Sequence, residues 1–455
     1  VQLADGADPV EPLFVSEAAP EGVTGVGGIG DEPALRKNLG DLGERARLRI
    51  VRMNVEVPGH ALSVRRSGSE SGTMAVMVLL SLTESELRRR TSLKWHTYPE
   101  DVLPLWVAEM DVSLHPAVGD ALRAAIDLGD TGYPFGNTYG EAFVAMATAR
   151  WGWTPDITTQ VRRSGDVMNA MLAVVLSTTA EGDNIVLNPP VYPPFWQVIS
   201  GYGRKIVASH LTTAGRLDLA DLERVFEESR PTAYLLCSPH NPTGAVHTLE
   251  ELTEVVALCR RFDVQLIADE IHAALVDPGT TFVPLLAVPG AERAVVATSA
   301  GKAWNLAAFK AGQLIAGAEI ATELWGKIGP LAFQSTGHFG AIAHTAALVH
   351  AQDWVDDLMI EVAANKQLLA RLLAEQVPEA RYTPAPGTYL AWVDLTETGL
   401  SDPGRWLLRH GKVAFNPGDV FGADYGTFVR INLATSPELI AQAVGRVADA
   451  LRARG

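Results

Sequence analysis

The sequence predicts an α/β protein whose core is a mostly parallel β-sheet covered by helices on both faces. Between about residues 130 and 320, short β-rich runs alternate with helical segments, which is the pattern of a parallel sheet. With 455 residues, of which 47% are hydrophobic and 20% charged, the chain is also long enough for two domains and a large core. The expected strands are the runs at 184–190, 205–211, 233–239, 264–270, 294–300 and 312–317.

The clearest helix between these strands is expected at 248–262, where the sequence reads TLEELTEVVALCRRF. Thr248 and Glu251 have the spacing of a capping box, in which each side chain binds the backbone N–H of the other. Four apolar residues recur at helical spacing on one face and are expected to be buried, namely Leu252, Val255, Val256 and Cys259.

The start of the chain has a different composition. Residues 1–73 are rich in Gly, Pro and acidic residues without a sustained apolar period, so we expect a disordered extension or a mis-annotated start. The first residue is valine, and Met74 and Met77 are candidates for the biological start. The apolar run at 74–82 is shorter than the roughly 20 residues that cross a bilayer. No small-residue cleavage site follows it, so we do not expect a signal peptide.

Charge and cysteine content limit the partners and the compartment. The formal net charge of -16 argues against nucleic acid or an anionic membrane as a general partner. The two cysteines, Cys237 and Cys259, lie in apolar patterns, so we expect buried free thiols in the reducing cytoplasm. Two such positions cannot supply a cysteine-based metal site, and we predict no metal.

Polar residues stand where three of the expected strands end. The first end carries the NPTG motif at 241–244, the next carries Asp269 with His272 behind it, and the third carries Ser299 followed by Lys302. Ligands of parallel sheets bind at these carboxyl ends. A carboxylate there is costly without a cationic partner, and apolar surroundings make a lysine amine nucleophilic. An acid for a ring-nitrogen cation and an amine for an aldehyde together describe a pyridoxal-phosphate site.

Three other interpretations of these residues are less consistent with the sequence. Lys302 as a P-loop lysine is excluded, because Val296 and Ala303 occupy the positions that require Gly and Ser or Thr. Lys302 as a solvated loop lysine, or Asp269 as a helix N-cap, would not explain why both stand at neighbouring strand ends.

The motifs SPHNPTG (238–244), ADEIH (268–272) and SAGKAWN (299–305) together resemble fold-type I pyridoxal-phosphate enzymes of the class I/II aminotransferase superfamily. Within that superfamily, LPLWVAEMD, PPVYPPF and DEIHAAL, which begin at residues 103, 189 and 269, resemble the MalY/PatB-type C–S lyases, also called cystathionine β-lyases. The resemblance runs from about Leu93 to the C-terminus.

The resemblance implies a domain layout. A large domain at 130–365 would hold a mostly parallel seven-stranded sheet, and a small α+β domain would combine 77–129 with 366–455. The functional unit would be a homodimer with shared active sites.

Five residues would surround the cofactor ring if the family's roles carry over. Lys302 would hold the cofactor as a Schiff base and later act as the catalytic base. Asp269 would pair with the pyridinium nitrogen, and Asn241 and His272 would lie beside the phenolic oxygen. Tyr192 would stack on the ring and, with Lys302, is a candidate proton donor to the leaving group.

Five further residues would bind the phosphate and the substrate. Ser299 and the backbone at Met168 and Asn169 would reach the phosphate, and Tyr133 would reach the phosphate of the neighbouring subunit. Arg430 would clamp the substrate's α-carboxylate, a two-point contact that lysine cannot copy.

The sequence also departs from the family. The phosphate loop reads GDVMNAM, and Lys310 stands where transaminases carry a phosphate-binding arginine, so the role of Lys310 stays open. Structural alternatives stay open for four residues: a buried structural role for His272, packing for Tyr192 and Tyr133, and a surface ion pair for Arg430.

The function implied is cleavage of cystathionine or a related cysteine S-conjugate to a thiol, pyruvate and ammonia. With cystathionine the thiol is homocysteine, which would place the protein in methionine biosynthesis. An aminotransferase acting on an amino acid is the first alternative, because it uses the same residues. A regulatory or binding protein built on the same fold is the second.

Overall fold

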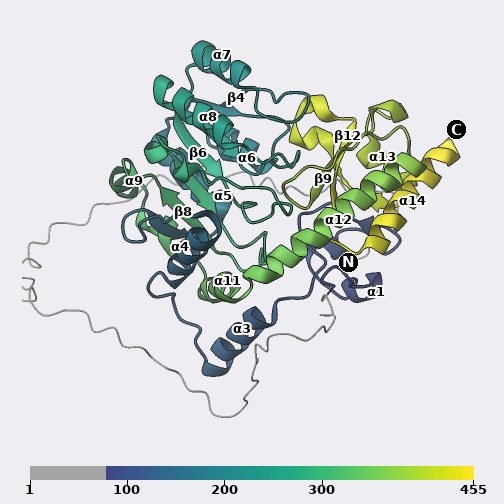
Figure 1. Ribbon diagram of the computed structural model, residues 1–455, viewed down its shortest axis with the longest axis horizontal. Coiled ribbons are helices and arrows are strands. Elements are labelled where there is room, and N and C mark those ends of the chain that lie inside the picture. Colours follow the sequence, from purple (N-terminus) through teal and green to yellow (C-terminus); the bar gives the residue numbers. More distant parts are fainter. Residues whose placement is uncertain (1–77, 455) are drawn as a thin grey trace, which may run out of the picture. The chain divides into compact units, whose positions relative to one another are not determined.

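The computed structural model describes residues 78–454, which belong to one compact unit that extends from Ala75 to Gly455 (Figure 1). The predicted extension at 1–73 and the two candidate starts, Met74 and Met77, lie outside the described residues. No helix within residues 78–454 is long and apolar enough to cross a membrane.

A seven-stranded sheet forms the centre of this unit, with the strand order β4–β3–β5–β6–β7–β8–β2. Only β8 runs against its neighbours, so the predicted mostly parallel sheet is confirmed. Six of its strands were expected; β2 was not, because an edge strand with the sequence VRRS shows no apolar run. The strands are β2 (Val161–Ser164), β3 (Asn184–Leu187), β4 (Lys205–Ala208), β5 (Ala233–Cys237), β6 (Gln265–Asp269), β7 (Val295–Thr298) and β8 (Gly312–Ala316).

Helices cover both faces of this sheet, because successive side chains of a strand point to opposite sides. On β5, Leu235 packs in one hydrophobic cluster with α5 and α6, whereas Tyr234 and Leu236 pack in another with α7 and α8. Figure 1 shows the sheet enclosed between these layers. The helices around the sheet are α3 (Pro116–Leu128), α4 (Thr138–Trp151), α5 (Val167–Thr178), α6 (Pro194–Ser200), α7 (Leu219–Ser229), α8 (Leu249–Phe262), α9 (Ala321–Lys327), α10 (Pro330–Gln334) and α11 (His338–His350).

A second hydrophobic core forms around a three-stranded antiparallel sheet of order β11–β12–β9. The 25-residue helix α12 contributes Leu358 to the first core and Leu369 to the second, and it extends toward α14 in Figure 1. The predicted domain boundaries at 129/130 and 365/366 stay predictions. The elements of this part are α1 (Glu84–Leu87), α2 (Leu93–His96), β1 (Leu103–Pro104), α12 (Gln352–Gln376), β9 (Leu390–Asp394), α13 (Pro403–His410), β10 (Val413–Ala414), β11 (Asn416–Pro417), β12 (Phe428–Asn432) and α14 (Pro437–Arg454).

The segment between β1 and α3 connects the two cores. Its backbone pairs with the end of β12, where Asn432 N donates to Leu105 O at 2.9 Å, and with the residues that follow, where Asp111 N donates to Ala434 O at 2.8 Å. Through these bonds the segment that contains WVAEMD is held beside the second sheet while its other side faces the first.

Local predictions on α8 are confirmed. Thr248 and Glu251 form both hydrogen bonds of the capping box, and the four apolar residues predicted on one face are all buried. Cys237 and Cys259 are buried free thiols.

We expect Thr248→Ala to lower the free energy of unfolding by about 1 kcal/mol, because α8 would lose the side chain that satisfies an N-terminal N–H group. Thr253→Ala is the matched control, since Thr253 is exposed on the same helix and its hydroxyl bonds only the Leu249 carbonyl. Urea unfolding followed by circular dichroism measures both variants. Equal midpoints for the two would contradict a stabilising cap.

Candidate active site

A cavity of about 400 Å³ lies at the carboxyl ends of β5 and β6 and beside the turn that follows β7. The structure therefore brings together the three strand ends that the sequence singled out. Of the ten predicted site residues, seven line this cavity: Met168, Tyr192, Asn241, Asp269, His272, Ser299 and Lys302.

Asp269 is the last residue of β6 and is buried. One carboxylate oxygen accepts a hydrogen bond from Ile271 N at 2.9 Å, and the side chain makes no ion pair within residues 78–454. Burial raises the pKa of Asp269 to about 7, against smaller lowering effects of that hydrogen bond and of Lys302. The carboxylate is thus placed where a bound cation would stabilise its charged form.

Lys302 lies in the turn after β7 and is partly buried. Its Nζ donates to the Ala108 carbonyl at 2.7 Å. Burial and, to a smaller extent, Arg430 lower the pKa of Lys302 to about 8, whereas Asp269 acts in the opposite direction. More of the amine is therefore unprotonated near neutral pH than in an ordinary lysine, which a nucleophile or a base requires.

Arg430 projects from β12 and is only 3% exposed. Its guanidinium donates to Asn241 Oδ1 at 3.0 Å and to the Trp106 carbonyl at 3.2 Å, and it lies over the Phe421 ring. Its Nε is buried without a hydrogen-bond partner among the described atoms, and no carboxylate there pairs with it. Burial lowers the pKa of Arg430 to about 10, so it stays charged. The structure therefore contradicts the alternative that Arg430 forms a surface ion pair.

His272 is buried beside Tyr389, with the two rings edge to face at 6.2 Å. Burial lowers the pKa of His272 to about 3, and the nearby Lys302 and Arg430 act in the same direction. The imidazole is therefore neutral at physiological pH. Its Nδ1 has no partner among the described residues, and the ring lines the cavity.

Tyr192 also lines the cavity, where its ring meets Phe195 edge to face. Burial raises the pKa of the Tyr192 hydroxyl, so the group keeps its proton. Either packing or a proton-donating role is compatible with this position.

The predicted phosphate end is more occupied than the sequence suggested. Ser299 Oγ donates to the Ala311 carbonyl at 2.7 Å, and Asn169 N donates to Asp166 Oδ1 at 2.8 Å. Asn169 is exposed and does not line the cavity. Lys310 lines it and pairs with the other oxygen of Asp166 at 3.1 Å.

Asp166 is the N-cap of α5, a role that we did not predict from GDVMNAM. An acidic residue directly before an apolar helical run is a typical N-cap signal. The predicted phosphate contacts of Met168, Asn169 and Ser299 stay predictions.

Tyr133 lies away from this cavity. Tyr133 is 98% exposed, and Phe135, in the same loop before α4, is 96% exposed. The predicted contact of Tyr133 with a neighbouring subunit stays a prediction.

Several contributors to the site were not predicted. Tyr389, whose hydroxyl donates to the Ala108 carbonyl at 3.1 Å, is fully buried beside His272, and His344 lines the cavity from α11. The carbonyls of Trp106 and Ala108 contact Arg430 and Lys302, and a backbone acceptor has no sequence signature of its own. Only the resemblance carried by WVAEMD pointed to that segment.

The geometry is that of a cofactor-dependent enzyme of the α/β class, and the chain belongs to the aminotransferase class I and II family, whose sequence model matches residues 113–447. It is 43% identical over 402 residues to a Mycobacterium tuberculosis protein whose name gives cystathionine beta-lyase as a proposed activity, with 83% of this chain and 98% of that protein covered. It is 31% identical to the cystathionine beta-lyase of Corynebacterium glutamicum, covering 80% of this chain and 98% of that one.

A crystal structure from Corynebacterium diphtheriae, of a protein whose proposed activity is that of a pyridoxal-phosphate-dependent beta-cystathionase, is also similar. The TM-score is 0.78 at 31% identity, and the match covers 82% of this chain and 99% of that one. The predicted fold-type I architecture and the resemblance to MalY/PatB-type C–S lyases are therefore confirmed.

We expect the reactivity of the Lys302 amine to rise about tenfold per pH unit from pH 6 to 8 and then level off, because burial lowers its pKa to about 8. Protein is first dialysed against hydroxylamine, which releases carbonyl compounds from lysine. Trace acetylation with acetic anhydride, read by peptide mass spectrometry, then gives the rate for each lysine. Exposed Lys205 is the internal control. Continued rise of the Lys302 rate to pH 10 would contradict the assigned environment.

Proposed function

We propose that the protein is a pyridoxal-phosphate-dependent C–S β-lyase that converts cystathionine, or a related cysteine S-conjugate, and water to a thiol, pyruvate and ammonia. The observation that carries the proposal is the cavity that Lys302 and Asp269 both line, together with Arg430, which is hydrogen-bonded to the cavity residue Asn241. The similarity over about four fifths of the chain to cystathionine beta-lyases supports the same reaction.

The residues present fit this cofactor. The buried carboxylate of Asp269 has no cationic side-chain partner within the described part of the chain, and a protonated pyridine nitrogen would supply one. The His272 Nδ1 and the Arg430 Nε are buried without partners there, so the site has polar atoms left for a ligand. The Lys302 amine is the group that an aldehyde requires.

We assign Lys302 to hold the cofactor, Asp269 to keep its ring nitrogen protonated, and Asn241 with His272 to flank its phenolic oxygen. We assign Tyr192 to pack on the ring, and Ser299 and Met168, which line the same cavity, to bind the phosphate. When bound, pyridoxal phosphate supplies an aldehyde that an amine attacks and a cationic ring that withdraws an electron pair.

The chain's own residues then handle the substrate and its protons. Arg430, with two donors already directed by Asn241 and the Trp106 carbonyl, binds the α-carboxylate and fixes which face of Cα meets Lys302. Once the substrate's amine has displaced it from the aldehyde, the unprotonated Lys302 amine removes the proton from Cα. The C–S bond breaks with both electrons leaving on sulfur, and Lys302 or the protonated Tyr192 hydroxyl supplies the proton that makes the thiol.

The comparisons favour a lyase over an aminotransferase. Relatives at 43% and 31% identity carry the name cystathionine beta-lyase, whereas a Bacillus subtilis relative that carries an aminotransferase name is 28% identical over 58% of this chain. The family name alone does not separate the two reactions, since both begin with removal of the same proton.

We further propose that the functional unit is a homodimer in the cytoplasm and that it serves methionine biosynthesis by releasing homocysteine. The exposed aromatic pair Tyr133 and Phe135 supports the dimer, because large exposed apolar side chains in one loop are typical of protein contact surfaces. In that arrangement Tyr133 would reach the partner's phosphate end.

We expect cystathionine to give equal amounts of homocysteine and pyruvate with the wild-type holoenzyme, and Lys302→Ala to lower the rate at least about 10³-fold, because it removes both the cofactor anchor and the base. Lys205→Ala, at an exposed strand end, should keep the wild-type rate. Lactate dehydrogenase coupling measures pyruvate. Amino-group transfer that depends on an added keto acid, with no thiol released, would contradict the lyase and identify the protein as an aminotransferase.

Arg430→Lys should raise KM for cystathionine about 10- to 100-fold with a smaller change in kcat, because lysine cannot make the two-point contact with a carboxylate. Arg405→Lys is the control, since Arg405 forms partly exposed ion pairs with Asp402 and Asp419. Initial rates over a substrate series separate the two constants. An unchanged KM would remove Arg430 from the carboxylate site.

A further inference from the structure

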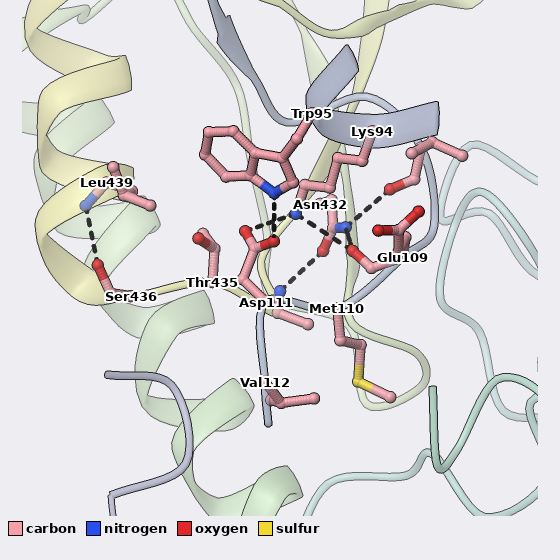
Figure 2. Close-up of polar contacts among 12 residues, drawn as sticks. Lys94, Trp95, Glu109, Met110, Asp111, Val112, Asn432, Thr435, Ser436 and Leu439 are labelled. Carbon is pink, nitrogen blue, oxygen red and sulfur yellow. Dashed lines mark hydrogen bonds and ion pairs between the residues drawn. The ribbon is translucent and has the colours of Figure 1, made fainter. Parts of the chain in front are cut away.

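A fully buried ion pair lies behind the cavity. The Nζ of Lys94, on α2, is 2.6 Å from Oδ2 of Asp111, and the two side chains are 0% and 1% exposed. Trp95 Nε1 donates to Asp111 Oδ1 at 2.8 Å, and Lys94 Nζ also donates to the Glu109 carbonyl at 3.1 Å. Figure 2 shows these groups converging on Asp111. Burying both charges is unfavourable unless further hydrogen bonds satisfy them, and here each charge has one.

The pair anchors a short backbone segment, Trp106–Asp111, which we call the strap. Carbonyls of the strap contact the reacting groups directly. The Ala108 carbonyl accepts from Lys302 Nζ at 2.7 Å and from the Tyr389 hydroxyl at 3.1 Å, and the Trp106 carbonyl accepts from Arg430 at 3.2 Å. The same six residues therefore touch the base and the carboxylate-binding group of the proposed reaction.

A second anchor holds the middle of the strap. Asn432, two residues after Arg430 on β12, is fully buried, and its Nδ2 donates to the carbonyls of Val107 and Glu109 at 2.8 and 2.7 Å. Its Oδ1 accepts from Ala434 N at 2.8 Å. In Figure 2 Asn432 lies between Lys94 and Glu109. The strap is thus bound to β12 by an amide and to α2 by a charge pair.

We propose that the strap is the positioning element of this active site, and that the Lys94–Asp111 pair, with Trp95, fixes the place at which its carbonyls meet Lys302 and Arg430. The inference rests on the proposed function, since that function makes Lys302 the base. An N–H···O bond persists over only a few tenths of an ångström, so a small shift of the strap would release both contacts. Apolar packing would hold α2 to the strap without fixing its direction, whereas three directed hydrogen bonds to one carboxylate and one carbonyl do so.

The test replaces the pair without leaving one charge buried. Lys94→Met combined with Asp111→Leu should lower kcat about 10- to 100-fold and raise KM for cystathionine, as expected when a reacting group shifts by an ångström. The midpoint of the pH titration of the visible band of bound pyridoxal phosphate should fall by about half a unit or more, because the Lys302 nitrogen carries the titrating proton and the Ala108 carbonyl stabilises its protonated form. The variant substitutes none of the charged groups that act on Lys302, namely Asp269, Glu109, Arg430 and Lys310, of which Glu109 belongs to the strap.

The control removes a second ion pair, in which Lys366 is buried and Asp277 is partly buried. Lys366 and Asp277 lie 2.6 Å apart, Lys366 also donates to the Ala385 carbonyl, and neither side chain bonds a residue of the strap. Lys366→Met combined with Asp277→Asn should lower thermal stability. It should leave kcat and KM within about twofold of the wild-type values and the titration midpoint within about a tenth of a pH unit.

Equal kcat, KM and titration midpoints in the two double variants, at equal loss of thermal stability, would overturn the proposal. Should Lys94→Met with Asp111→Leu fail to fold, Trp95→Phe decides, because it removes one hydrogen bond to Asp111 and should shift the same three quantities in the same direction. A wild-type enzyme that released no pyruvate would overturn the proposed function alone. The titration midpoint would still test the strap, since it requires only cofactor bound to Lys302.

Discussion

The loss of water around a carboxylate and an amine at neighbouring strand ends is the constraint on which the rest of the site depends. Burial raises the pKa of Asp269 and lowers that of Lys302, so each group is unfavourable in its charged form until a partner arrives. A ligand that brings a ring cation to Asp269 and an aldehyde to Lys302 relieves both. The burial of these two groups therefore makes the cavity selective for one chemistry.

The sheet explains why these two groups meet. Asp269 pairs in register with Cys237 on one side and Ala297 on the other, so the end of β6 lies between the end of β5, which leads to Asn241, and the turn that carries Lys302. Parallel strands collect their carboxyl ends at one edge, whereas the antiparallel β8 returns the chain to the opposite edge. A cluster of polar residues from three distant parts of the sequence is the direct result.

Much of this could be predicted, and the failures have physical causes. Interior strands such as β5 and β6 are buried on both faces, so their sequences are apolar throughout, whereas the edge strand β2 contains Arg162 and Arg163 and gave no signal. Lys302 and Asp269 were found because a charge after an apolar run is rare. The strap was not, because its contribution is made by carbonyls, and the Lys94–Asp111 pair joins residues whose contact depends on tertiary packing. The N-cap role of Asp166 could have been predicted, because an acidic residue directly precedes an apolar helical run.

Lys302 and Arg430 come from different sheets, so the backbone between the sheets determines how far apart they lie. Lys302 follows the seven-stranded sheet and Arg430 belongs to the three-stranded one, so their separation depends on how the two cores are joined. The strap contacts Lys302 through the Ala108 carbonyl and Arg430 through the Trp106 carbonyl, and it is tied to β12 by Asn432. In the proposed reaction, a substrate carboxylate bound by Arg430 would therefore act on the same six residues that contact the Lys302 amine. Substrate binding and placement of the base would then be coupled through one segment of backbone as well as through the substrate.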